Sequence, residues 1–137
     1  GPTGELMEPL GPLTMDEARA AFAEQAAGLA AGGVDFFLVE TMSSLDEVQA
    51  DVEGARQASD LPVVVTMTFD TNYRTMMGVT PAEAAEALAE AGASVIGANC
   101  GQGAAQMLEV ARQLKSATGL PLLHSTAYYT LNHIPAK

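Results

Sequence analysis

The fold is decided by residues 35–69, which read DFFLVETMSSLDEVQADVEGARQASDLPVVVTMTF. A short apolar run opens this stretch, a helix-forming segment from Ser44 to about Ser59 follows, and a second apolar run rich in Val and Thr closes it. Short apolar runs without polar alternation are typical of strands buried on both faces of a parallel sheet. The stretch therefore predicts one strand–helix–strand unit of a parallel α/β protein.

The same alternation extends in both directions from this unit. Strands are expected at 35–39, 62–68, 94–98 and 120–123, and helices at about 14–31, 44–59, 80–91 and 104–117. Three helix starts carry Ser or Thr followed three positions later by Glu, the pattern of a capping box. These pairs are Thr14 with Glu17, Ser44 with Glu47 and Thr80 with Glu83.

Two architectures share this rhythm of roughly 30 residues per unit, an open doubly wound sheet and a closed (β/α)8 barrel. A barrel typically needs about 250 residues, and the 137 residues here hold about half of one. We therefore expect residues 1–137 to form a single incomplete α/β domain. The tail at 124–137 has no clear period and is assigned no structure.

Composition excludes several classes of function. The formal net charge is -11, and the six basic residues are scattered along the chain. Nucleic acids and anionic membranes are bound through clustered Lys and Arg, so neither is an expected partner. The longest apolar runs fall well short of the roughly 20 residues that span a bilayer. A single cysteine excludes an internal disulfide and favours a cytoplasmic location.

Polar residues follow the apolar part of each predicted strand. Glu40, Thr68 and Cys100 stand at or just past the carboxyl ends of three successive strands. Parallel strands place such residues on one rim, where the sites of α/β proteins gather, so we expect these side chains to converge on one cleft. A carboxylate at position 40 could bind an amine, or it could be a solvated strand end or a cap for the next helix.

Several of these residues also have structural interpretations. A lone cysteine such as Cys100 is more often a buried small hydrophobe than a ligand. Zinc takes three or four protein ligands, and only His124 and His133 could add nitrogen ligands here. The Gly101–Gly103 loop favours a tight turn over a phosphate cradle, because it lacks a P-loop lysine. For Met67, Met76 and Met77, a role in packing is expected rather than one in binding a cofactor.

The order of four motifs resembles that of the homocysteine S-methyltransferase family, which includes cobalamin-dependent methionine synthase and betaine–homocysteine methyltransferase. The resemblance covers about residues 1–123, and the Gly-Ala-Asn-Cys-Gly segment is its most specific part. In chain order the motifs are Gly1-Pro2-Thr3-Gly4, Asp35-Phe36-Phe37-Leu38-Val39-Glu40-Thr41, Val79-Thr80-Pro81 and Gly97-Ala98-Asn99-Cys100-Gly101.

The resemblance implies a partial (β/α)8 barrel running from about the end of strand three through strand seven. It gives Cys100 the place of one of three zinc-binding cysteines, and the adjacent pair that completes the family's zinc site has no counterpart in this sequence. Glu40 matches the glutamate that helps to hold the substrate amine. With Thr68 and Asn99 it forms the expected substrate-binding set, and Asn99 is also expected to support Cys100. No catalytic residue is assigned.

The activity implied by the resemblance is transfer of a methyl group to the zinc-bound thiolate of homocysteine, giving methionine. The sequence does not identify the methyl donor, although methylcobalamin in a partner domain is one that the family admits. The chain alone is expected to be an incomplete fragment of such an enzyme. The alternative is a non-catalytic α/β module that self-associates through open strand edges, because half a barrel leaves two edges unpaired.

Overall fold

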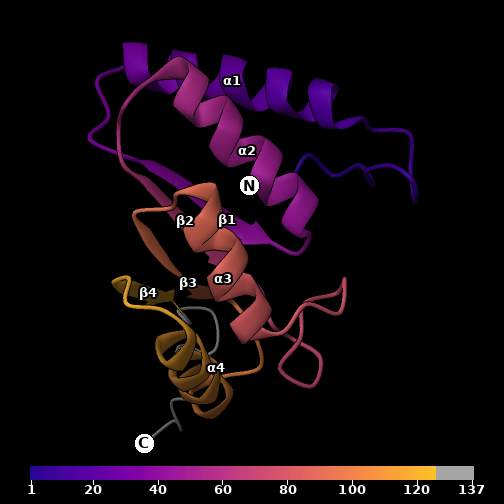
Figure 1. The fold of residues 1–137 in the computed structure, drawn as a ribbon, viewed down its shortest axis with the longest axis vertical. Helices are drawn as coiled ribbons and strands as arrows, with labels where there is room; N and C mark the ends of the chain where they lie inside the picture. Colours follow the sequence, from indigo (N-terminus) through magenta and orange to yellow (C-terminus); the bar gives the residue numbers. More distant parts are fainter. Residues whose placement is uncertain (126–137) are drawn as a thin grey trace, which may run out of the picture.

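Four parallel strands and four helices alternate along the chain in the computed structural model, which describes residues 1–125 (Figure 1). The strands are β1 (Phe37–Met42), β2 (Val63–Met67), β3 (Val95–Asn99) and β4 (Leu122–Ser125). The helices are α1 (Met15–Ala31), α2 (Leu45–Ala58), α3 (Pro81–Ala91) and α4 (Ala104–Ala117). Within residues 1–125, no helix has the length and apolar character needed to cross a membrane.

The strands pair in the order in which they occur in the sequence, β1-β2-β3-β4, and every pair is parallel. Val39, Val65 and Ile96 share one row of the sheet and are buried beneath the helices. Leu38, one residue along β1, points to the opposite face and is 44% exposed. The helices therefore cover one face only, and we call the other the inner face.

One-sided helices and sequential strands are the arrangement of successive units of a (β/α)8 barrel. A doubly wound sheet carries helices on both faces and reverses its strand order at a switch point, so that alternative is wrong for residues 1–125. Figure 1 shows the helices succeeding one another along the sheet from α1 to α4. The prediction of a parallel sheet with outer helices, forming part of a barrel, is confirmed.

The strand boundaries differ from the predicted ones at both edges of the sheet. β1 continues through Glu40 and Thr41 to Met42 instead of ending at residue 39. β4 spans Leu122–Ser125, so the first two residues of the predicted tail belong to the sheet. The rest of that tail, including Asn132 and His133, lies outside the described residues.

The core fills the space between the sheet and the helices. β2 is buried along its whole length, as expected for a strand with neighbours on both sides. Its buried, helix-facing side chains belong to one apolar cluster with buried residues of the helices. The largest side chains with almost no exposed surface are Met42, Met67, Leu88, Ile96 and Leu114. The prediction that Met67 packs in the core is confirmed.

The capping boxes at Thr14 and Thr80 form as predicted, each with both reciprocal hydrogen bonds. The third predicted box is only half present. Ser44 accepts a hydrogen bond from the Glu47 backbone N–H at 3.4 Å, but the Glu47 carboxylate turns away from the cap. Its Oε1 instead accepts hydrogen bonds at 2.7 Å from both the backbone N–H and the hydroxyl of Thr3. A tertiary contact has replaced the local one.

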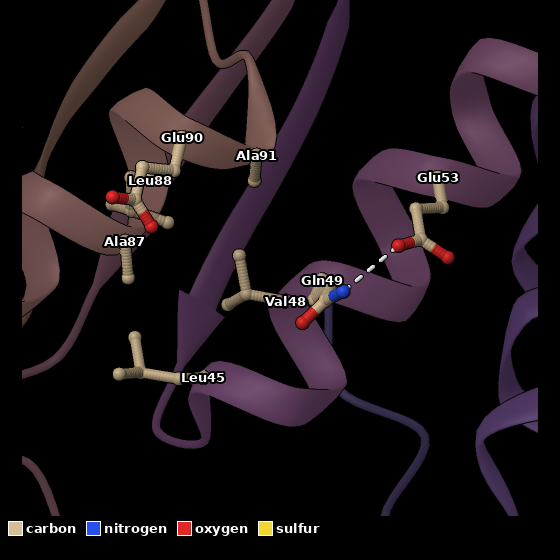
Figure 2. Close-up of a pocket in the computed structure, with 8 residues that line it drawn as sticks. All are labelled: Leu45, Val48, Gln49, Glu53, Ala87, Leu88, Glu90 and Ala91. Carbon is tan, nitrogen blue, oxygen red and sulfur yellow. Dashed lines mark hydrogen bonds between the residues drawn. The ribbon is translucent and has the colours of Figure 1, made fainter.

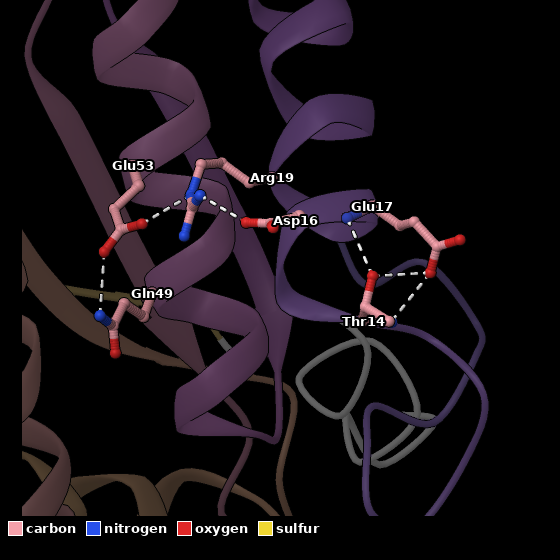
Figure 3. Close-up of polar contacts among 6 residues, drawn as sticks. All are labelled: Thr14, Asp16, Glu17, Arg19, Gln49 and Glu53. Atoms are coloured by element: carbon pink, nitrogen blue, oxygen red, sulfur yellow. Dashed lines mark hydrogen bonds and ion pairs between the residues drawn. The ribbon is translucent and has the colours of Figure 1, made fainter.

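Polar contacts also join α1 to α2 along their solvent-facing edge (Figure 3). Arg19 of α1 forms ion pairs with Asp16 in its own helix at 2.9 Å and with Glu53 of α2 at 2.7 Å. Gln49 donates a hydrogen bond to the other Glu53 oxygen at 2.9 Å. The hydrogen bonds from Gln49 and Arg19 hold the pKa of Glu53 below its ordinary value.

The packing of α1 on α2 requires a glycine at position 54. A Cβ atom there would lie 2.7 Å from the Arg19 carbonyl oxygen and 2.8 Å from the Ala23 nitrogen, both backbone atoms that cannot swing aside. We expect Gly54→Ala to lower the free energy of unfolding by about 1–3 kcal/mol, the usual effect of overpacking. Urea denaturation followed by circular dichroism measures this change.

Gly28→Ala is the matched control, because Gly28 is also helical and a Cβ there meets nothing within 4 Å. Replacing an unhindered helical glycine by alanine stabilises a helix by roughly 0.5–1 kcal/mol. The two substitutions should therefore have opposite signs. Equal effects at the two positions would contradict the close approach of the helices.

Candidate functional site at the carboxyl rim of the sheet

The end of β1 is irregular where the site begins. The register with β2 shifts between Val39 and Met42, so Glu40 and Thr41 form a bulge. Thr41 has a left-handed backbone, with φ of 66°, which non-glycine residues rarely adopt. Glu40 is exposed at this bulge, beside the Gly1–Gly4 segment, because a Cβ on Gly1 would lie 3.4 Å from the Glu40 carbonyl oxygen.

Asn99, the last residue of β3, joins three strands through its buried side chain. Its Oδ1 accepts hydrogen bonds from the Thr41 backbone N–H at 3.0 Å and from the Thr66 hydroxyl at 2.9 Å. Its Nδ2 donates to the Thr41 hydroxyl at 2.7 Å and to the Cys100 sulfur at 3.3 Å. These four bonds use both lone pairs and both protons of the amide.

Cys100 directly follows β3 and is exposed. The alternative of a buried core cysteine is therefore wrong. Its backbone is left-handed, with φ of 61°, and its N–H donates to the Ser125 carbonyl oxygen at 3.0 Å. The Cys100 thiol stands at the carboxyl rim with the Asn99 amide as hydrogen-bond donor.

Thr68 directly follows β2, and its backbone N–H donates to the Met42 carbonyl oxygen at 2.9 Å. Its hydroxyl is buried without a hydrogen-bond partner among residues 1–125. The structure thus brings Thr41, Thr66, Asn99 and Cys100 into direct contact and places Thr68 beside the end of β1. Convergence of Glu40, Thr68 and Cys100 on one cleft stays a prediction.

His124 lies within β4 rather than past its end. It occupies the same row as Ala98 and Met67, whose side chains face the helices. Its ring is therefore on the opposite side of the sheet from the Asn99 amide. Burial lowers the pKa of His124, which favours the neutral ring. This is the position of a core histidine, and it does not place the ring on the rim beside Cys100 as a nitrogen ligand.

The loop from Gly101 to Gly103 is a turn filled by a side chain. Gln106, in the first turn of α4, accepts a hydrogen bond on its Oε1 from the Gln102 backbone N–H at 2.6 Å. A phosphate cradle needs free backbone N–H groups, and this one is already bonded. The prediction of a tight turn in place of an anion site is supported by this contact.

The loop after β2 exposes two methionines. Asn72 and Tyr73 have left-handed backbones and form a tight turn between Thr71 and Arg74, whose backbones exchange hydrogen bonds. Met76 is 78% exposed and Met77 is 41% exposed, so neither packs in the core as Met67 does. They stand at the end of a polar loop that leaves the sheet.

Two hollows are lined by residues other than those of the rim. One, of about 280 Å³, lies near the start of α2 and is lined by the N-terminal segment together with Met76 and Met77. The other, of about 290 Å³, lies in the helix layer, where Leu45 and Val48 of α2 face Ala87 and Leu88 of α3 (Figure 2). Neither is lined by Cys100.

Sequence reasoning missed Thr41 and Thr66 as partners of Asn99. A signal for Thr66 was present, because it pairs with Gly97 on the inner face and Asn99 stands two residues beyond that glycine. Diagonal neighbours of this kind lie within reach of each other across a sheet. No local signal indicates the left-handed backbone of Thr41.

Comparison with known proteins places the chain in a family. A family model described as homocysteine S-methyltransferase matches residues 1–132. Over 124 residues the chain is 34% identical to a methionine synthase of Mycobacterium leprae, which covers 87% of this chain and 10% of that protein. Over 102 residues it is 36% identical to the S-methylmethionine–homocysteine S-methyltransferase BHMT2 of Pongo abelii, covering 73% of this chain and 28% of that protein.

The fold has a counterpart among solved structures. The apo crystal structure of the homocysteine methyltransferase MmuM from Escherichia coli matches with a TM-score of 0.76 and 16% identity, over 96% of this chain and 51% of that one. The chain belongs to the homocysteine S-methyltransferase family. It spans about half the length of the MmuM chain and smaller shares of the two relatives.

Proposed function

We propose that this chain forms the homocysteine-binding rim of a homocysteine S-methyltransferase domain. Glu40 pairs with the substrate ammonium group, and Cys100 acts at the sulfur end of the substrate. The observation that carries this proposal is the Asn99 amide, which bonds to Thr41 beside Glu40 and to the Cys100 sulfur. A link of this kind supports joint action of two family motifs that are 60 positions apart in the sequence.

The reaction proposed for the complete domain forms one bond and breaks another. The homocysteine sulfur, as its thiolate, attacks the donor's methyl carbon, the new bond is S–CH3, and the donor leaves with the electron pair of the broken bond. The residues on the rim bind and orient the amino acid so that its sulfur faces the donor. Thr68 is the third proposed substrate contact, with a buried hydroxyl that has no hydrogen-bond partner among residues 1–125.

Zinc is part of the proposal, but residues 1–125 do not make a complete zinc site. They contain no group of three or more His, Cys, Asp or Glu side chains placed to hold a metal ion. A zinc site uses three or four protein ligands, and the described residues offer the Cys100 thiolate. Cys100 is therefore proposed as one ligand, with the others supplied from outside these residues.

The methyl donor stays open in this proposal. One relative is by name a methionine synthase and another uses S-methylmethionine, so membership of the family does not select a donor. Methylcobalamin carried by a partner domain remains a prediction from the sequence. Methionine synthesis in the cytoplasm is the corresponding proposal for the cellular role.

Zinc titration of the 137-residue chain, with and without homocysteine and with its size measured in parallel, tests the ligand assignment. We expect no submicromolar zinc binding by the monomer, because one thiolate is too few ligands. We expect weak zinc binding strengthened by homocysteine and abolished by Cys100→Ser. Submicromolar binding by a Cys100→Ser monomer would contradict the role given to Cys100.

The same size measurement tests a second candidate, self-association through the sheet. Among residues 1–125, β1 and β4 are edge strands with a partner on one side only. Phe36, Leu38 and Leu123 are 40–50% exposed beside these edges or on the inner face. Apolar surface next to an unpaired edge favours association of copies. Concentration-dependent dimers without any effect of zinc or homocysteine would favour this candidate.

A further inference from the structure

We propose that Asn99 is a positioning residue that fixes the separation between the two ends of the substrate site. This inference rests on the proposed function and assigns Asn99 a different task from substrate binding. Both lone pairs and both protons of its amide already have partners inside the protein. Nothing is left on the side chain to bond a ligand without breaking one of these contacts.

The orientation of the amide follows from the chemistry of its partners. The Thr41 backbone N–H can only donate, so the atom 3.0 Å from it has to be the acceptor Oδ1. Nδ2 then faces the Thr41 hydroxyl and the Cys100 sulfur. A flipped amide would set two donors against each other at Thr41.

Two left-handed residues depend on this amide. Thr41 and Cys100 have φ values of 66° and 61°, a left-handed conformation that is unfavourable for residues other than glycine. Both make hydrogen bonds with Asn99, Thr41 through its backbone as well as its side chain. Such backbones persist where their surroundings hold them, and they cluster at functional sites.

The consequence is a fixed link between Glu40 and Cys100. Glu40 precedes Thr41 in the bulge of β1, and Cys100 follows Asn99 at the end of β3. The buried Thr66 hydroxyl of β2, the strand between β1 and β3, donates a hydrogen bond to the Asn99 side-chain oxygen. The amide thus sets where the amine-binding carboxylate stands relative to the thiol.

The test compares Thr41→Val, Thr41→Ser and Asn99→Ala in the 137-residue chain. Valine keeps the shape of threonine but removes the hydroxyl that Nδ2 bonds, and serine keeps that hydroxyl. The first readout is hydrogen exchange at the Thr41 amide, which donates directly to Asn99. The second is the rate at which iodoacetamide alkylates Cys100 at one fixed pH.

Asn99→Ala should speed exchange at the residue-41 amide by about tenfold, because the oxygen that accepts its hydrogen bond is lost. Thr41→Val should also speed it by about tenfold, because the Asn99 amide loses the hydroxyl that fixes its orientation toward this N–H. Both should change the Cys100 alkylation rate by about threefold or more, whereas Thr41→Ser should behave as wild type. Amides in the middle of β2 should keep their protection. Thr118→Val, which removes a local contact with the Leu120 N–H in the turn between α4 and β4, serves as the control.

Alkylation and Thr41 exchange within about twofold of wild type in both variants would overturn the inference. The inference would also be overturned if Thr41→Val reduced amide protection evenly over the whole sheet. That result would mean that Thr41 stabilises the fold in general and does not position the site. If Asn99→Ala does not fold, the comparison of Thr41→Val with Thr41→Ser is sufficient to test the inference. Neither amide exchange nor Cys100 alkylation uses zinc or homocysteine. A negative result would therefore contradict the positioning role of Asn99 without contradicting the proposed methyltransferase role.

Discussion

Gly97→Ala is expected to unpair β4 from β3 and to destabilise the chain by about 3 kcal/mol or more, the upper range for overpacking. A Cβ atom at position 97 would lie 1.6 Å from the Leu123 carbonyl oxygen and 2.6 Å from its carbonyl carbon. These are backbone atoms of the neighbouring strand, so relief requires the strands to separate. Urea denaturation measures the loss, and amide exchange in β4 localises it.

Gly119→Ala is the control for this substitution. Gly119 lies just before β4, its φ is not left-handed, and a Cβ there meets nothing within 4 Å. Its free energy of unfolding should stay within about 0.5 kcal/mol of wild type, as is usual for surface changes. A Gly97→Ala protein that keeps wild-type stability and β4 protection would refute the close approach of β3 and β4.

Asp51→Asn is expected to stabilise the chain at pH 7 and to remove a pH dependence. Burial raises the pKa of Asp51 from 3.8 to about 6, with a contribution from Glu47 and against the opposing charge of the amino terminus. The folded protein thus keeps a proton that the unfolded chain loses. Stability should therefore fall as the pH rises from about 4 to about 6 and stay level above that.

The size of this pH effect is on the order of 2–3 kcal/mol, from 1.36 kcal/mol per pKa unit. Thermal unfolding at pH 4, 5, 6 and 7 measures it. Asp60→Asn, which removes an exposed carboxylate from a loop, should leave the wild-type slope between pH 4 and 6 in place. An Asp51→Asn protein with that slope unchanged would show that another group carries it.

The sequence predicts the helices and strands well because their signals are local. An apolar run such as the one at β2, or a capping pair such as Thr80 with Glu83, acts over a few residues. The side of the sheet on which each rim residue lies follows from period-two alternation once the strands are placed. Cys100 at the carboxyl end of β3 is therefore predictable, and its exposure is not.

The features that sequence reasoning missed depend on contacts between distant segments. The Glu47 carboxylate leaves its capping box for Thr3, 44 positions away. Asn99 bonds to Thr41, 58 positions away, and that contact accompanies a bulge that shifts the end of β1. Local sequence propensity does not predict these two hydrogen bonds. The partner residue in each is distant in the sequence and comes close only when the chain folds.

The sequential order of the strands has a consequence for how the chain folds. Within residues 1–125, each strand after β1 pairs with the one just before it in the sequence, so none of these pairings has to wait for a distant segment to be synthesised. Loops closed by one helix are short, which lowers the entropic barrier to each docking event. A ribosome-bound chain can therefore add β2, β3 and β4 one at a time to a growing edge, and an arrest at any stage leaves the earlier pairs intact.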